Sequence, residues 1–345
     1  LGHRLFAVDG SKINLPRELR AFGYQTPCEM AHYPQGVLSC LYQLKSQLPF
    51  DFDLVAHANE RWCALRHLER LENNDVVVYD RGYFSYPMLH RHCETGIHAI
   101  FRLQESSSTV IQEFFSSPQT DTEVTIDPSP QSRADIHKQY PDLDIVPLRM
   151  RLLKYEMAGS VFCLGTTLVA AHQRYALQEF MDVYHGRWGI EELYKLSKRI
   201  FIVEDFHAKT ERGVKQELFA HFVLITMNRL FANRADAALN PPEPSTSMEP
   251  RDSSNDPAFT AVAPGLKTNF KNCVHVFERS LEELLLLHAR MKSAVQRAFQ
   301  AIVGQYQRIR PSRSYPRRSM RPETKWHPSK EKKRDQKAAV SLAPA

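Results

Sequence analysis

Residues 5–11 read LFAVDGS and residues 76–82 read VVVYDRG. In both stretches a short apolar run stops at an aspartate, which is typical of a buried strand followed by a turn. If the two strands are parallel neighbours in an open α/β sheet, Asp9 and Asp80 lie side by side at the edge where such sheets bind ligands. Two carboxylates at that edge repel unless a divalent cation lies between them. Each aspartate taken alone is better explained as an ordinary turn residue, because Asp commonly ends strands.

The segments around these two strands alternate between strand-like and helix-like patterns, which favours an α/β fold. Further strands are predicted over residues 36–45, 50–57 and 97–103, and helices over 60–71, 86–92, 175–234 and 281–303. From about residue 104 to residue 167, Ser, Thr, Pro and Asp dominate and short β-like pieces recur. We interpret this region as a mainly β insertion. The predicted organisation is a first part of the α/β core over 1–103, the β-rich insertion over 104–168, a second part of the core over 169–236, a disordered linker over 237–262, and C-terminal helices with a basic tail over 263–345.

Charge is unevenly distributed along the 345 residues. The net charge is only +6, but residues 308–337 carry twelve Lys or Arg against three acids. Tyr315 and Trp326 are interleaved with these cations, a pattern suited to an arm that contacts phosphates. A run of charge is just as often a solvated surface, and the sequence leaves both interpretations open.

Composition argues against two other classes of protein. The longest apolar runs, such as residues 222–227, fall far short of the roughly 20 residues that span a bilayer. The six cysteines are scattered and form no C-x-x-C pair. Reduced thiols in a cytosolic protein are therefore favoured over disulfides or a zinc site.

The most informative stretch is residues 184–198, YHGRWGIEELYKLSK. At about 100° per residue, four polar side chains fall within a ~60° arc of one helix. They are Tyr184, Arg187, Glu191 and Lys198. Apolar residues lie on the opposite side, so one helix face is predicted to be core and the other to carry a carboxylate flanked by two cations and a phenol. A solvated face with an ordinary Arg–Glu pair remains the alternative.

Taken together, the three acids suggest a chemistry. Asp9, Asp80 and Glu191 could hold two Mg²⁺ or Mn²⁺ ions, because hard oxygen ligands suit these ions. Arg187 and Lys198 could then bind phosphates beside the ions. This is the equipment of two-metal phosphodiester chemistry, which needs no separate general base because the metal lowers the pKa of its bound water.

On these motifs the sequence resembles the DDE transposases of bacterial insertion sequences, in the group with a Y-x2-R-x3-E-x6-K signature. Residues 184–198 match that spacing without departure. Residues 6–11 resemble the first acidic motif of the family and residues 77–85 the second. Residues 206–209 and 216–221 also resemble family segments. The resemblance extends over residues 5–234.

The resemblance implies a ribonuclease-H-like core with a mainly β insertion before the helix that carries the third acid. Asp9 would lie on the first strand, Asp80 after the fourth and Glu191 on a later helix. These three residues would be the catalytic and metal-binding residues, with two Mg²⁺ ions that Mn²⁺ can replace. The residues expected to contact DNA are Tyr184, Arg187 and Lys198, with help from Arg81 and Tyr83. An aromatic residue of the insertion would hold a flipped base, and the candidates are Phe114, Phe115 and Phe162.

The implied activity is cut-and-paste DNA transposition. The acids would nick the ends of the element, and the freed 3′-hydroxyl would attack the other strand to form a hairpin or attack target DNA directly. The expected partners are double-stranded DNA and a second copy of the chain on that DNA, in the bacterial cytoplasm at the nucleoid and not at a membrane. The family usually has a helical recognition domain before the first acidic strand, so we expect the chain to be truncated at its N-terminus.

Two other functions stay open at this point. One is a nuclease on the same scaffold that hydrolyses DNA without joining it. The other is a catalytically silent DNA-binding remnant that interferes with a full-length transposase. The intact acids argue against the remnant, whereas the expected truncation argues for it.

Overall fold

The computed structural model describes residues 2–56, 59–157, 159–169, 175–241, 265–286 and 291–309. The chain divides into two compact units, Leu1–His221 and Phe222–Ala345. Helix α7 (Glu211–Leu239) continues into the first positions of the predicted linker. The rest of that linker, up to residue 262, and nearly all of the predicted basic tail lie outside the described residues.

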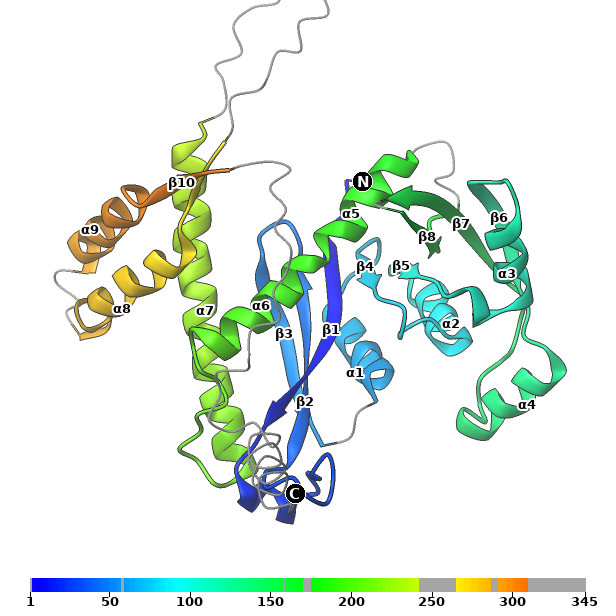
Figure 1. Cartoon of the computed structure of the whole chain (residues 1–345), viewed down its shortest axis with the longest axis horizontal. Coiled ribbons are helices and arrows are strands. Elements are labelled where there is room, and N and C mark those ends of the chain that lie inside the picture. Colours follow the sequence, from blue (N-terminus) through cyan, green and yellow to red (C-terminus); the bar gives the residue numbers. More distant parts are fainter. Residues whose placement is uncertain are drawn as a thin grey trace, which may run out of the picture. The chain divides into compact units, whose positions relative to one another are not determined.

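The first unit is built on one eight-stranded sheet with helices on it (Figure 1). Its strands are β1 (Leu5–Asn14), β2 (Gln35–Gln43), β3 (Leu48–Val55), β4 (Val76–Tyr79), β5 (His98–Arg102), β6 (Asp121–Ile126), β7 (Leu148–Met157) and β8 (Ser160–Thr166). They are arranged in the order β3-β2-β1-β4-β5-β8-β7-β6. Strands β1, β4 and β5 are parallel, and the other pairings are antiparallel. The predicted α/β fold, consistent with a ribonuclease-H-like core, is confirmed.

Helices supply the apolar partners of both faces of the sheet. They are α1 (Glu60–His67), α2 (Tyr86–Thr95), α3 (Thr109–Ser116), α4 (Pro130–Gln139), α5 (Leu177–Gly186) and α6 (Trp188–Arg199). All four residues of β4 are fully buried, which explains why its sequence is apolar throughout. Val77 belongs to the same core cluster as Ala64 of α1, whereas Val78 belongs to the cluster of Phe180 of α5. A strand covered on both faces has no polar side.

Strand β1 is longer than its sequence predicts. We expected the strand to stop at a turn around Asp9, but it continues through that residue to Asn14. Strand β2 pairs with it along this whole length, whereas β4 pairs with it only as far as Ala7. Asp9 therefore lies just beyond the point where the parallel pairing ends, and Asp80 directly follows β4 at the same place. The predicted neighbourhood of the two acids is correct, although Asp9 lies within a strand and not in a turn.

The predicted β-rich insertion differs from expectation in two ways. Its strands β6, β7 and β8 extend the main sheet, because β8 pairs antiparallel with β5. It also contains two helices, and residues such as Ile111 and Phe114 of α3 pack in the same core cluster as Val77. An uncovered β5 would leave its backbone groups unpaired at a sheet edge, and β8 satisfies them.

The second unit is mainly helical. Beyond residue 221 it contains the remainder of α7, helices α8 (Phe270–Leu286) and α9 (Met291–Val303), and a short antiparallel pair, β9 (Leu266–Thr268) and β10 (Tyr306–Arg308). The prediction of a single helix over 281–303 is wrong, because that range covers the end of α8 and all of α9. The two helices share a core cluster that includes Phe277, Leu284 and Ala294. Of the helices that the structure describes, none is both long and apolar enough to cross a membrane.

An ion pair with a buried guanidinium and a partly exposed carboxylate joins β7 to the edge strand β6. Arg151 is 2% exposed, and its guanidinium donates to both carboxylate oxygens of Asp121 at 2.9 and 2.6 Å. It also donates to the carbonyl oxygen of Tyr175, just before α5. One side chain thus ties three segments together, and its burial depends on the paired carboxylate.

We predict that Asp121→Ala lowers the free energy of unfolding by about 3 kcal/mol, because it leaves the Arg151 charge buried without its carboxylate. The matched control is Asp127→Ala, which removes a carboxylate from the exposed pair with Arg133 and should cost less than about 1 kcal/mol. Urea unfolding of the two variants and the parent measures the difference. Equal losses for both variants would contradict the stabilising role of the pair that compensates the buried Arg151 charge.

Candidate active site

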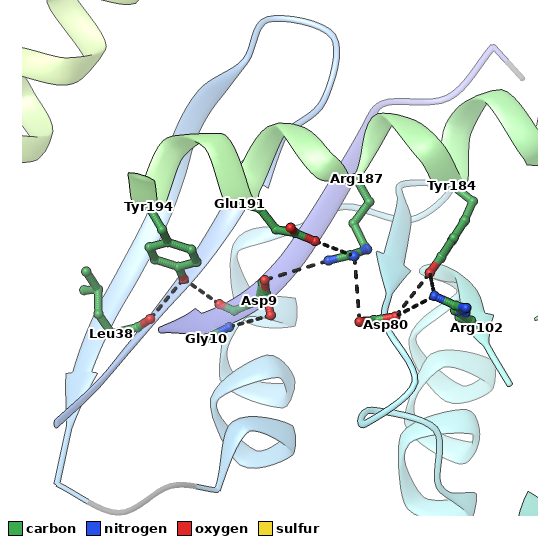
Figure 2. Close-up of polar contacts among 9 residues, drawn as sticks. All are labelled: Asp9, Gly10, Leu38, Asp80, Arg102, Tyr184, Arg187, Glu191 and Tyr194. Atoms are coloured by element: carbon green, nitrogen blue, oxygen red, sulfur yellow. Dashed lines mark hydrogen bonds and ion pairs between the residues drawn. The ribbon is translucent and has the colours of Figure 1, made fainter. Parts of the chain in front are cut away.

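The three acids predicted from separate parts of the sequence surround one guanidinium (Figure 2). Arg187 Nη1 lies 3.8 Å from Asp9 Oδ2, and Arg187 Nη2 lies 3.7 Å from Asp80 Oδ2. The same Nη2 donates a 2.9 Å hydrogen bond to Glu191 Oε1. Asp9 comes from β1, Asp80 from the turn after β4 and Glu191 from α6, so the fold gathers these carboxylates at the carboxyl end of the parallel strands.

Two features of α6 hold Glu191 over the sheet. A Cβ atom on Gly189 would lie 2.9 Å from the Tyr42 ring, so glycine lets the helix approach β2 closely. The Tyr194 hydroxyl lies 2.7 Å from the carbonyl oxygen of Asp9 and 2.9 Å from that of Leu38. These contacts fix α6 to the backbone of β1 and β2 beside the first acid.

A second group of contacts fixes Asp80. The Tyr184 hydroxyl donates to Asp80 Oδ1 at 3.1 Å, and Arg102 Nη1 donates to that hydroxyl at 3.4 Å. Arg102 Nη1 also lies 3.9 Å from Asp80 Oδ1, and its guanidinium lies 4.4 Å from the centre of the Phe162 ring. Arg102 belongs to none of the motifs singled out in the sequence. It is the last residue of β5, the parallel neighbour of β4, so the same rule about strand ends that located the two aspartates also points to it.

Burial and like charge make the site electrostatically strained. Burial raises the pKa of Asp9 to about 6; Arg187 and the Gly10 amide act against this rise, whereas the charges of Glu60 and Glu191 add to it. Burial disfavours the charge on Arg187, but the surrounding carboxylates raise its pKa above the ordinary value. Arg187 is only 8% exposed, so its charge depends on these acids as they depend on it.

The helix that carries the signature is interrupted. Helix α5 ends at Gly186 and α6 begins at Trp188, with Arg187 between them in helical conformation. Tyr184 and Arg187 are buried, at 4% and 8% exposed. The alternative of a solvated polar face is therefore wrong for these two residues. Their polar groups face the acids.

The other predicted DNA-contact residues lie in different surroundings. Lys198 Nζ donates to the carbonyl oxygen of Lys12 at 2.6 Å and lies 3.9 Å from Glu204, so the structure does not bring it to the three acids. Arg81 is exposed beside Asp80. Tyr83 is 2% exposed within the core, and the expectation that its ring contacts DNA is not supported, because DNA has no access to it.

Comparison with known proteins gives the family. The sequence matches the family model described as a transposase DDE domain over residues 1–227. The chain belongs to this family. A cryo-EM structure of a piggyBac transposase synaptic complex with hairpin DNA is similar at a TM-score of 0.43 and 7% identity, with 86% of this chain and 58% of that chain covered. The chain thus spans less than two thirds of the length of that transposase. Among curated proteins, none matches this chain.

DDE transposases generally use divalent metal ions, and the acids of this DDE domain suit such ions in charge and in ligand type. Three carboxylates share one close guanidinium, and all their donor atoms are the hard oxygens that Mg²⁺ and Mn²⁺ prefer. With Arg187 between them, however, no three His, Cys, Asp or Glu side chains among the described residues are grouped to hold a metal ion by themselves. In this arrangement the three carboxylates are therefore not preformed as a metal site. Asp9, Asp80 and Glu191 are the residues that would hold the metal.

We predict that Asp9→Asn stabilises the metal-free protein. Because the folded-state pKa of Asp9 is raised to about 6 from 3.8, ionising Asp9 costs stability as the pH rises through this window. At pH 7.5 in EDTA the variant should gain about 2 kcal/mol in unfolding free energy, and the gain should fall to a few tenths of a kcal/mol near pH 3.5, where Asp9 is mostly protonated in both states. Urea unfolding at the two pH values measures it, with Glu192→Gln, an exposed carboxylate of α6, as the control. A loss of stability at pH 7.5 would contradict the prediction.

Proposed function

We propose that this chain is the catalytic core of an insertion-sequence transposase of the Y-x2-R-x3-E-x6-K group, which performs Mg²⁺-dependent cleavage and strand transfer of double-stranded DNA. The observation that carries the proposal is the convergence of Asp9, Asp80 and Glu191 on Arg187 in a chain of the DDE family. We place its action in the bacterial cytoplasm, at the nucleoid, where its DNA substrate lies.

The proposed metal ligands are Asp9, Asp80 and Glu191, holding two Mg²⁺ ions that Mn²⁺ can replace. When bound, these ions supply activation of the nucleophile and stabilisation of the leaving oxygen. In cleavage, an oxygen of water bonds to phosphorus and the bond to the 3′ oxygen breaks, which leaves a 3′-hydroxyl and a 5′-phosphate. In transfer, that hydroxyl attacks a second phosphodiester, and the oxygen of the attacked strand leaves.

The chain's own polar groups orient these acids. Tyr184 donates to Asp80, and Arg102 supports that phenol from β5. Arg187 keeps the carboxylates together and, once their charge is shared with cations, its guanidinium can turn to a phosphate oxygen, for which its planar fork is suited. Its Nε is buried without a hydrogen-bond partner among the described residues, so it has a donor to offer.

The residues proposed to contact DNA are those near the acids whose side chains are accessible to solvent. Exposed Arg81 and partly exposed Lys198 are the proposed contacts to the DNA backbone. Among the three aromatic candidates of the insertion, Phe162 has the best support for holding a flipped base. It is half-buried and lies against Arg102, whereas Phe114 is 4% exposed in the core. A pair of chains acting on two DNA ends is part of the proposal.

We predict that Asp80→Asn and Glu191→Gln each reduce Mg²⁺-dependent nicking of supercoiled plasmid by about a thousandfold or more, because each removes a proposed metal ligand. DNA binding in a filter assay should keep its affinity and its dependence on salt. Glu192→Gln, one residue from Glu191 and exposed, is the matched control and should nick like the parent. Nicking at the parent rate by either variant would overturn the metal assignment.

A second assay separates transposase from the other two functions. Oligonucleotides that carry the terminal sequence of the element and end in a free 3′-hydroxyl are supplied with target plasmid and Mg²⁺. Joined product supports strand transfer. Cleavage without any joined product would indicate a nuclease, and binding without cleavage would indicate a silent remnant.

A further inference from the structure

A cavity of about 540 Å³ lies at the end of the edge strand β3, apart from the cluster of acids around Arg187. Its walls come from the last residues of β3, the start of α1 and the first turns of α7. All of the residues that line it belong to the first compact unit. A cavity of this volume is large enough for a small organic ligand or a nucleotide.

An exposed tryptophan forms part of the wall. Trp62 is 48% exposed, although it belongs to a residue type that is usually well buried. Its amide donates to the side chain of Asn59 at 3.1 Å, which fixes the start of α1. The guanidinium of Arg66 lies 5.0 Å from the centre of the ring and covers part of it. The rest of the ring offers an aromatic surface on which a flat ligand can stack.

Two carboxylates of the cavity keep one oxygen available as an acceptor. Asp53 Oδ2 forms an ion pair with Arg66. Glu211 Oε1 accepts from the Tyr24 hydroxyl at 3.2 Å and lies 3.0 Å from Lys215 Nζ. In the part of the chain that the structure describes, Asp53 Oδ1 and Glu211 Oε2 accept no hydrogen bond. Free carboxylate oxygens suit a ligand with an amino group, such as cytosine.

The charges of the cavity balance. Each of the two acids is paired with a cation, so the interior favours an uncharged, flat ligand over a bare phosphate. The two cations are partly exposed, with 51% of the Arg66 side chain and 40% of the Lys215 side chain accessible to solvent. Cations at such a rim can contact a phosphate attached to the ligand. The combination of ring, acceptors and rim cations matches a nucleotide.

The strand register places the cavity beside the acidic site. Asp53 of β3 lies opposite Ser39 of β2, and Ser39 lies opposite Gly10, the residue directly after Asp9. Neighbouring strands are about 4.8 Å apart, so the backbones of Asp53 and Gly10 are separated by roughly 10 Å. This span corresponds to about three nucleotides at 3.4 Å per nucleotide along a DNA strand.

The helix that carries Trp62 is also fixed to the turn of the second acid. Arg61 Nε, one residue before Trp62, donates to the carbonyl oxygen of Gly82 at 2.9 Å. Gly82 lies two residues after Asp80. The wall of the cavity and the acidic site are therefore parts of one connected structure, and a strand bound at the acids is within reach of the cavity.

We propose that this cavity binds one unpaired nucleobase of the DNA strand that lies across the acidic site. The base stacks on Trp62, and its amino group donates to Asp53 or Glu211. Arg66 or Lys215 contacts the adjacent phosphate. Binding of this kind rests on the proposed function, because that function brings a DNA strand to the acids. Cytosine is preferred over thymine, which has no amino group.

The test compares three fluorescein-labelled oligomers of equal length, namely oligodeoxycytidylate, oligothymidylate and an abasic oligomer, by fluorescence anisotropy with the full chain in EDTA. All three carry the same phosphates, so differences in affinity report contacts with bases. Trp62→Ala should weaken binding of the cytidylate oligomer by about tenfold and leave that of the abasic oligomer unchanged, because it removes only stacking. Trp62→Phe should restore most of the loss.

The matched control is Phe22→Ala, which removes an aromatic ring that is also 48% exposed but does not line the cavity. This variant should bind all three oligomers like the parent. Equal affinity of the parent for the three oligomers, or parent-like binding of the cytidylate oligomer by Trp62→Ala, would overturn the inference.

A second variant tests the choice of base. Asp53→Ala combined with Glu211→Ala should abolish the preference for cytidylate over thymidylate, because it removes both acceptors. Both acids belong to partly exposed ion pairs, so the melting temperature should change little. An unchanged preference in this variant would show that the acids do not bind the base.

Competition with dCMP separates a DNA strand from a free nucleotide as the source of the base. We expect dCMP to displace the cytidylate oligomer only at a concentration at least a hundredfold higher, because it lacks the other phosphates of the strand. Displacement by dCMP at the concentration at which the unlabelled oligomer competes would assign the cavity to a free nucleotide and overturn the assignment to DNA.

Asp80→Asn separates this inference from the proposed function. The variant should lose nicking but keep the preference for cytidylate over the abasic oligomer. If the parent nicks and joins DNA without any base preference, only the role of the cavity is wrong. If the parent shows the base preference and neither nicks nor joins DNA, the proposed function fails and the cavity stands as a binding site for single-stranded DNA.

Discussion

The buried guanidinium of Arg187 is the constraint on which the site depends. A buried cation needs compensating charge, and Arg187 has it from three carboxylates on different elements. A lysine could not replace it, because an ammonium is a single point of charge, whereas the two Nη atoms of a planar fork reach different acids at once. The position of Arg187 between α5 and α6 matters as well. It allows both helices to pack on the sheet while the side chain at their junction points to the strand ends.

The sheet creates the space that this cluster occupies. Strands β1 and β4 pair only as far as Ala7 and Val78, and beyond that point β1 continues beside β2 alone. The backbone on the β4 side of Asp9 is therefore left open to side chains. Asp9 and Asp80 enter this opening from the strand ends, and Glu191 enters it from α6. The early end of β4 thus leaves room beside Asp9 for Asp80, Arg187 and Glu191.

The sequence was sufficient to predict the parts of this arrangement that depend on local pattern. Apolar runs that end in aspartate predicted two strands, and parallel neighbours place their ends together, so Asp9 and Asp80 were found. What depends on tertiary contacts was not predictable. The length of β1 is set by pairing with β2, and the burial of Tyr83 is set by packing against α2 and β4, neither of which has a signal in local sequence. The range 281–303 was taken for one helix because two amphipathic helices in succession show the same periodicity as one.

Residues that act through a partner were the hardest to identify. Arg102 looks like an ordinary surface charge in sequence, since a single arginine at the end of a strand is common, and its role follows from its contacts with Tyr184 and Asp80. The role of such a residue becomes apparent only when its neighbours in the structure are known, because a charge in contact with a buried polar group affects that group, whereas a charge in solvent does not. The same reasoning explains why the acids are crowded around Arg187 at a cost in stability. Carboxylates whose charge was fully satisfied by the protein would have little affinity left for a cation, so the excess of negative charge that strains the fold is the property that would let this site bind metal.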